Sequence, residues 1–102
     1  MAVADFSLKG KVAIVKTRPD TVLEDVRTAM RLADYQAALP KDKDTLIKIN
    51  ISWDTWYPAC SSTPWQVEGA IQELQAAGYP RLIAAHNDTV VVDARAGEHN
   101  NK

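Results

Sequence analysis

The chain of 102 residues is long enough for one domain, and its apolar and charged fractions, 46% and 25%, are ordinary for a globular protein. A formal net charge of −1, with both signs mixed along the sequence, argues against a nucleic-acid-binding domain, which usually has a basic face. No apolar run approaches the roughly 20 residues that a membrane helix needs. We therefore expect a cytoplasmic protein that binds neither nucleic acid nor membrane.

The first predicted elements are a strand and a helix. Residues 11–17, KVAIVKT, are rich in branched apolar side chains and predict a buried strand after an N-terminal extension of residues 1–10. A helix should follow, because Thr21 and Glu24 have the spacing of a capping box. One face of that helix should pack on the core, since apolar residues recur at helical spacing at Val22, Val26, Ala29, Ala33 and Ala37.

A second strand, a second helix and a third strand come next. Residues 45–51, TLIKINI, predict the strand. The helix is marked at both ends, since Thr63 and Gln66 predict a capping box and Gly78 predicts a left-handed cap. Residues 81–86, RLIAAH, predict the third strand.

The order of elements in residues 11–93 predicts the fold class. Strands alternating with helices in a β-α-β-α-β order are typical of an α/β domain with a small parallel sheet, Rossmann-like with two or three layers. Residues 89–93 are either a fourth strand or a loop, and residues 94–102 are either a polar tail or a truncation point. Such a small sheet is incomplete, because its edges or one apolar face stay uncovered. We therefore expect a missing C-terminal domain or self-association.

Polar residues follow each predicted strand. Ligands of parallel sheets bind at the carboxyl ends of the strands, and a helix start offers free N–H groups to an anion. We therefore expect a small anionic ligand at this edge of the sheet. The expected ligand-binding residues are Lys16, Lys48, Asn50, Ser52, Thr63 and Asn87, and the expected catalytic residues, for proton transfer, are His86 and Asp88.

Lys48 is unusual because it lies within an apolar strand, on the face opposite Ile47 and Ile49. A buried lysine without a partner costs several kcal/mol or loses its proton. We therefore expect its ammonium group to meet an anionic ligand or a carboxylate, or to reach water along the stem of the side chain. A ligand contact and a purely structural role both remain open.

Cys60 lies just before the second helix start, a position that can activate a thiol as a nucleophile if His86 acts as its base. The alternative is an unreactive loop cysteine. One cysteine and two histidines without paired spacing do not form a zinc motif, so we expect no metal site. The surrounding aromatic residues are interpreted either as core or pocket wall, or as an interaction surface; they are Trp53, Trp56, Tyr57 and Trp65.

The segments KVAIVKT, LIKINIS, STPWQVEGAIQELQAAGY and RLIAAHNDT together resemble a known family. It is the amino-terminal part of an iron–sulfur-associated domain of unknown function (the "DUF three-six-two" type), found in bacterial and archaeal proteins. The match spans roughly residues 11–88. The matching positions are Lys48, Ile49 (where the family more often has proline), Asn50, Thr63, Pro64 and Gly78.

The resemblance implies an α/β domain of a longer, redox-linked protein, and many members add a ferredoxin-like segment with closely spaced cysteines. This sequence has no such segment, and Cys60 alone cannot ligate a cluster, so we expect no iron–sulfur cluster on this chain alone and name no cofactor. Two functions remain. The chain is the N-terminal ligand-binding part of a larger cytoplasmic, redox-linked enzyme, or it is a non-catalytic binding or assembly module that uses its tryptophan-rich loop.

Overall fold

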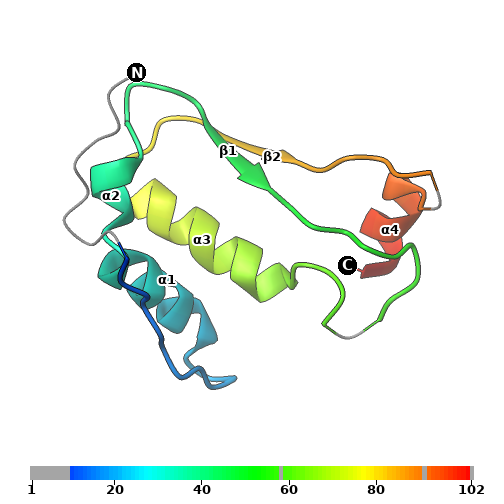
Figure 1. The fold of residues 1–102 in the computed structure, drawn as a ribbon, viewed down its shortest axis with the longest axis horizontal. Helices are drawn as coiled ribbons and strands as arrows, with labels where there is room; N and C mark the ends of the chain where they lie inside the picture. Colours follow the sequence, from blue (N-terminus) through cyan, green and yellow to red (C-terminus); the bar gives the residue numbers. More distant parts are fainter. Residues whose placement is uncertain (1–9, 58, 91, 102) are drawn as a thin grey trace.

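The computed structural model describes residues 10–57, 59–90 and 92–101. Its elements, in chain order, are α1 (Val22–Leu32), α2 (Tyr35–Ala38), β1 (Thr45–Lys48), α3 (Pro64–Ala76), β2 (Leu82–Ala85) and α4 (Ala94–Asn101) (Figure 1). The two strands form a parallel sheet, and α3 lies in the connection between them. The predicted α/β class is therefore confirmed, with a smaller sheet than the sequence predicts. No helix among the described residues is long and apolar enough to cross a membrane.

Helix α3 begins and ends where the sequence predicts. At its start, the backbone N–H and the hydroxyl of Thr63 both donate to Oε1 of Gln66, at 3.3 and 3.0 Å. After its end, Gly78 takes the left-handed conformation with φ +81°, and the N–H of Tyr79 donates to the carbonyl of Leu74. Local capping chemistry thus sets both ends of the helix that connects the two strands.

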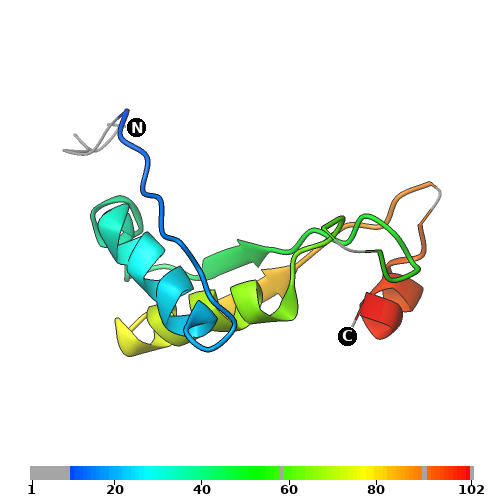
Figure 2. The same cartoon turned by 90° about the horizontal axis from the view of Figure 1, so that it is seen from below.

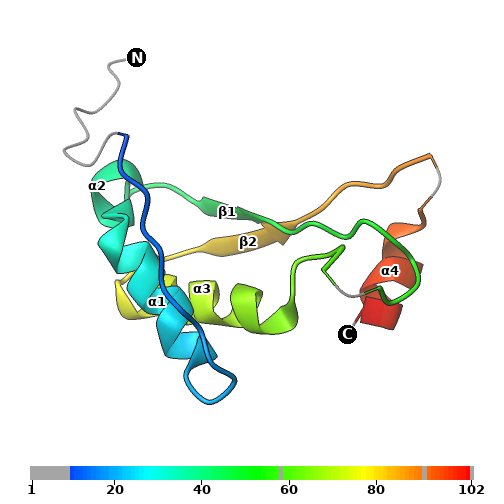
Figure 3. The ribbon, with the colours of Figure 1, turned by 60° about the horizontal axis from the view of Figure 1, so that its bottom comes forward.

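The sheet has one covered and one uncovered face. Its register runs from Thr45 opposite Leu82 to Lys48 opposite Ala85. Helix α3 lies against one face, and no described element lies over the other (Figures 2 and 3). The side chains of β1 alternate accordingly: Thr45 and Ile47 are half-buried, whereas Leu46 and Lys48 are exposed.

Residues 11–17 form no strand, so the predicted β-α-β-α-β order is wrong at its first element. The segment runs beside α1, away from the sheet (Figures 1 and 3). Val12 and Ile14 are 83% and 86% exposed. Branched residues favour strands only where a partner strand gives them a surface to pack on, and no described residues form such a strand beside this segment. Residues 89, 90, 92 and 93 are not in a strand either, and residue 91 lies outside the described part of the chain, as do residues 1–9 of the expected extension.

The first helix is shorter than predicted. It ends at Leu32, because Asp34 takes a left-handed conformation with φ +52° and the chain then begins the short α2. At the start of α1, the expected capping box between Thr21 and Glu24 does not form. The hydroxyl of Thr21 instead donates to Oδ2 of Asp25 at 2.6 Å.

Helices α1 and α3 pack closely where α3 has Gly69 (Figure 2). A Cβ atom added at this glycine would lie 2.9 Å from Cβ of Val26 and 3.1 Å from the carbonyl oxygen of Leu23. One turn further along α3, the buried carboxylate of Glu73 faces side chains of α1 and α2. The interface between the two helices therefore combines a tight contact with a buried charge.

Residues 94–101 form helix α4, in the stretch that the sequence predicts to be either a polar tail or a truncation point. Two aspartates accept hydrogen bonds from its first turn: Oδ1 of Asp93 from the N–H of Ala96 at 2.8 Å, and Oδ1 of Asp88 from the N–H of Ala94 at 3.1 Å. The helix lies beyond the carboxyl ends of β1 and β2 (Figure 3). The whole molecule is extended, since its radius of gyration of 15.3 Å exceeds the roughly 13 Å of a compact domain of this length.

Candidate functional site

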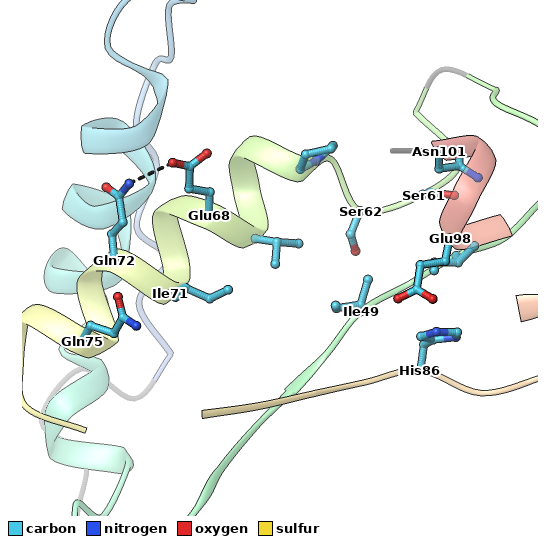
Figure 4. Close-up of a pocket in the computed structure, with 13 residues that line it drawn as sticks. Ile49, Ser61, Ser62, Glu68, Ile71, Gln72, Gln75, His86, Glu98 and Asn101 are labelled. Atoms are coloured by element: carbon cyan, nitrogen blue, oxygen red, sulfur yellow. Dashed lines mark hydrogen bonds between the residues drawn. The ribbon is translucent and has the colours of Figure 1, made fainter. Parts of the chain in front are cut away.

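A cleft of about 490 Å³ lies at the carboxyl ends of β1 and β2, between α3 and α4 (Figure 4). Its apolar wall is formed by Ile49, Ile51, Val67 and Ile71. The polar side chains at the end toward α4 are Ser61, Ser62, His86, Glu98 and Asn101. Small-molecule sites typically have volumes of roughly 300–1,000 Å³ and combine apolar walls with a few polar groups. This cleft has both properties, at the edge where parallel sheets bind ligands.

His86 follows directly after β2 and lines the cleft, at the edge where the sequence predicts it. Its Nδ1 atom is buried and has no hydrogen-bond partner among the described residues. The carboxylate of Glu98, from α4, is directed toward the imidazole ring (Figure 4). Buried polar atoms in native proteins nearly always have a partner, so the unpartnered Nδ1 atom of His86 is uncommon.

Asn50 and Ser52 hold the loop that borders the cleft. The backbone N–H of Asn50 donates to Oγ of Ser62 at 3.0 Å, and the N–H of Ser62 donates back to the carbonyl of Asn50 at 2.8 Å. The side-chain amide of Asn50 donates to Oγ of Ser52 and to the carbonyl of Cys60. The N–H of Ser52 donates to Oγ of Ser61 at 3.2 Å. Asn50 and Ser52 therefore do not line the cleft themselves. Their hydrogen bonds position Ser61 and Ser62, which do line it.

Helix α4 brings Glu98 and Asn101 to the cleft. Gly97 is buried against the segment after β1, since an added Cβ would lie 2.6 Å from Cγ2 of Ile51. The side-chain amide of Asn101 donates to the carbonyl of Trp53 at 2.9 Å. The sequence predicts neither cleft residue, because this polar stretch is interpreted either as a tail or as a truncation point.

The two lysines expected to hold an anion lie outside the cleft lining. Lys48 is exposed, and its ammonium group donates to the carbonyl of Ile49 at 2.7 Å. Of the arrangements expected for Lys48, the structure shows the one in which the ammonium group reaches water. Lys16 is exposed, and the strand that would carry it to the sheet edge does not form.

Three other predicted residues have partners within the chain. Thr63 takes part in the cap of α3, and Asp88 accepts a hydrogen bond from the first turn of α4. Asn87 is exposed and donates to the carbonyl of Asp88 at 3.3 Å. Of the predicted catalytic pair, only His86 lines the cleft.

Cys60 is half-buried and does not line the cleft with His86, so the described structure does not assemble the nucleophile and base considered from the sequence. Among the described residues, no group of three His, Cys, Asp or Glu side chains could hold a metal ion. The aromatic residues of the loop are exposed rather than packed as core: Trp53 by 52%, Trp56 by 67%, Tyr57 by 64% and Trp65, at the start of α3, by 38%.

Comparisons of this protein with protein-family models, with curated proteins and with solved structures find no match. The resemblance expected from the strand ending in Asn50 and the helix start at Thr63 therefore stays a prediction.

Proposed function

We propose that this chain is a ligand-binding α/β domain that holds a small molecule in the cleft at the carboxyl ends of β1 and β2. The observation that carries the proposal is the cleft itself, whose apolar wall of Ile49, Val67 and Ile71 ends at the polar side chains of His86 and Glu98. Small-molecule sites typically combine an apolar wall with a few polar groups in this way.

The cleft favours a ligand with an apolar body and one polar head. The side chains of Val67 and Ile71 on α3, with Ile49 after β1, would contact the body. His86 and Glu98 would face the head. In the larger, redox-linked enzyme that the sequence resemblance implies, this domain would bind the ligand, and His86 would be its candidate for proton transfer.

The expected anionic ligand has less support from the positions of the charges. Lys16 and Lys48 lie outside the cleft lining, and the start of α3 is occupied by its own cap at Thr63. An anion would therefore enter the cleft without a lysine or arginine of the described lining to balance its charge.

A titration followed by methyl NMR tests the proposal, with 1-hexanol as a probe that has an apolar body and a small polar head. Shift changes should concentrate on Ile49, Val67 and Ile71. A Val67→Phe variant fills the cleft and should abolish them, whereas Val90→Phe, at a fully exposed position, should leave them unchanged. No shifts at these residues, or equal shifts in the Val67→Phe variant, would show that the cleft is not a binding site.

A second candidate function is an assembly module, and the exposed apolar surface favours it. Val12 and Ile14 are 83% and 86% exposed, Leu46 on the uncovered sheet face is 65% exposed, and Trp56 is 67% exposed. Monomeric proteins rarely leave so many large apolar side chains in water. Self-association or a further domain would cover them.

Light scattering after size-exclusion chromatography tests this second candidate. The wild-type chain should have a mass that rises with concentration, and a Val12→Lys/Ile14→Lys variant should shift toward the monomer. A Val90→Lys variant provides the control, because Val90 is as exposed but lies at the other end of the chain. A wild-type chain that stays monomeric at high concentration would exclude self-association through these side chains.

A further inference from the structure

We propose that the cleft prefers a ligand whose polar head is a protonated amine, an inference that rests on the proposed function. The charges of the lining are the first argument. Glu68 and Glu98 contribute carboxylates, and among the described residues the lining contains no lysine or arginine. A cleft with this balance attracts a cation and disfavours an anion.

The two carboxylates are not equivalent. Glu68 accepts a hydrogen bond from the side-chain amide of Gln72 at 3.0 Å, on the side of α3 away from His86 (Figure 4). The carboxylate of Glu98 accepts no hydrogen bond from the described residues, and it is directed toward the imidazole ring at the end of the apolar wall (Figure 4). Glu98 is therefore the side chain that would pair with the amine.

The apolar wall defines the rest of the ligand. Val67 and Ile71 line the cleft from α3 and Ile49 lines it from the segment after β1, and Ile49 lies between Ile71 and the polar end with Glu98 and His86 (Figure 4). A linear or branched hydrocarbon chain would cover these side chains while its ammonium group reaches the carboxylate. The ligand class is thus an amphipathic amine.

The imidazole of His86 lines the same end of the cleft as the carboxylate. An ammonium group has three donors and no acceptor, so it can donate one hydrogen bond to Glu98 while its other donors reach water at this exposed end. A carboxylate head would instead meet Glu98 with the same charge.

Three probes with the same hydrocarbon chain test this inference: hexylammonium, 1-hexanol and hexanoate, titrated against the full chain by methyl NMR. Hexylammonium should bind roughly three- to tenfold more tightly than hexanol, the range of an exposed ion pair reinforced by a charged hydrogen bond. Hexanoate should bind most weakly. The advantage of the ammonium should shrink at high salt, since Glu98 is exposed.

A Glu98→Gln variant should remove the advantage of hexylammonium over hexanol while keeping the apolar wall. An Asp42→Asn variant removes an exposed charge outside the cleft and should keep the advantage. Hexanoate binding as tightly as hexylammonium, or an advantage that persists in Glu98→Gln, would overturn the amine preference while cleft binding stands. If none of the probes shifts Ile49, Val67 or Ile71, the proposed function fails and the inference fails with it.

Discussion

Arg31 on α1 donates a hydrogen bond from Nε to Oε2 of Glu73 on α3, at 3.0 Å, and so joins two helices through a carboxylate that is only 4% exposed. Arg27 donates to the same oxygen at 3.2 Å, and the hydroxyl of Tyr35 donates to Oε1 at 3.0 Å. Burial raises the pKa of Glu73, but the hydrogen bonds from Arg31, Tyr35 and Arg27 outweigh it and hold that pKa below its ordinary value. Glu73 is therefore charged at neutral pH and stabilises the interface.

A Glu73→Gln variant tests this role, because it keeps the size of the side chain but removes its charge and one acceptor. The free energy of unfolding, measured with urea, should fall by about 2 kcal/mol, since a buried group loses charged hydrogen bonds. Glu68→Gln on the same helix makes the same chemical change at an exposed position and should cost less than about 0.5 kcal/mol. Equal losses in the two variants would contradict a special role for the buried carboxylate.

The same cluster makes stability depend on alkaline pH. Burial first, and then the hydrogen bond to Glu73, raise the pKa of Tyr35 from 10.0 to about 12. Below pH 10 the phenol is neutral in both states and its contribution is fully present. Between pH 10 and 12 the unfolded chain loses the proton while the folded chain keeps it, so stability falls as pH rises. Urea unfolding of wild type and Tyr35→Phe at pH 9 and pH 11 checks this: the wild type should lose more stability than the variant. Parallel losses would rule out Tyr35 as the source.

The elements that the sequence predicts correctly are those set by local chemistry. Helix α3 begins at the cap of Thr63 and Gln66 and ends before Gly78, because each signal acts within a few residues. A strand also needs a neighbour, and no sequence pattern shows whether one is present. Residues 45–48 pair with β2 and form a strand. Residues 11–17 have an equally apolar pattern but no described strand beside them, and they form none.

The candidate site shows the same division between local and distant information. The sequence predicts His86 at the edge of the sheet, because the position follows from the strand that precedes it. It does not predict Glu98 and Asn101, since a polar stretch gives no sign of where it packs. Asp93 before Ala94 did carry a signal, because an aspartate followed by good helix formers is typical of a helix start.

Gly69 should not tolerate a larger residue, because the backbone of α1 lies against it. An alanine within a helix normally stabilises by about 1 kcal/mol relative to glycine. In a Gly69→Ala variant the new Cβ would lie 2.9 Å from Cβ of Val26 and 3.1 Å from the carbonyl of Leu23, so α1 and α3 must separate. We expect a net loss of about 1–3 kcal/mol in the free energy of unfolding, measured with urea. A gain of about 1 kcal/mol would instead show that the helices are not in close contact here.

The contact of Gly97 with Ile51 links the position of α4 to ligand binding. In a Gly97→Ala variant the new Cβ would lie 2.6 Å from Cγ2 of Ile51 and 3.4 Å from the carbonyl of Trp53. Helix α4 should therefore move away from the segment after β1, weakening the hydrogen bond from Asn101 to Trp53 and withdrawing Glu98 from the cleft. The methyl signals of Ile51 should shift, and the affinity for hexylammonium should fall to that for hexanol.

The control for this variant is Arg95→Ala, because Arg95 is exposed on the same helix and does not line the cleft. It should leave the Ile51 signals and both affinities unchanged. If Gly97→Ala keeps the preference for hexylammonium and gains about 1 kcal/mol of stability from its helix propensity, α4 does not depend on this contact. The carboxylate of Glu98 would then have to reach the cleft independently of the packing of Gly97. A loss of preference in Gly97→Ala alone would instead show that a close backbone contact, remote from the ligand, sets the position of the charge that selects it.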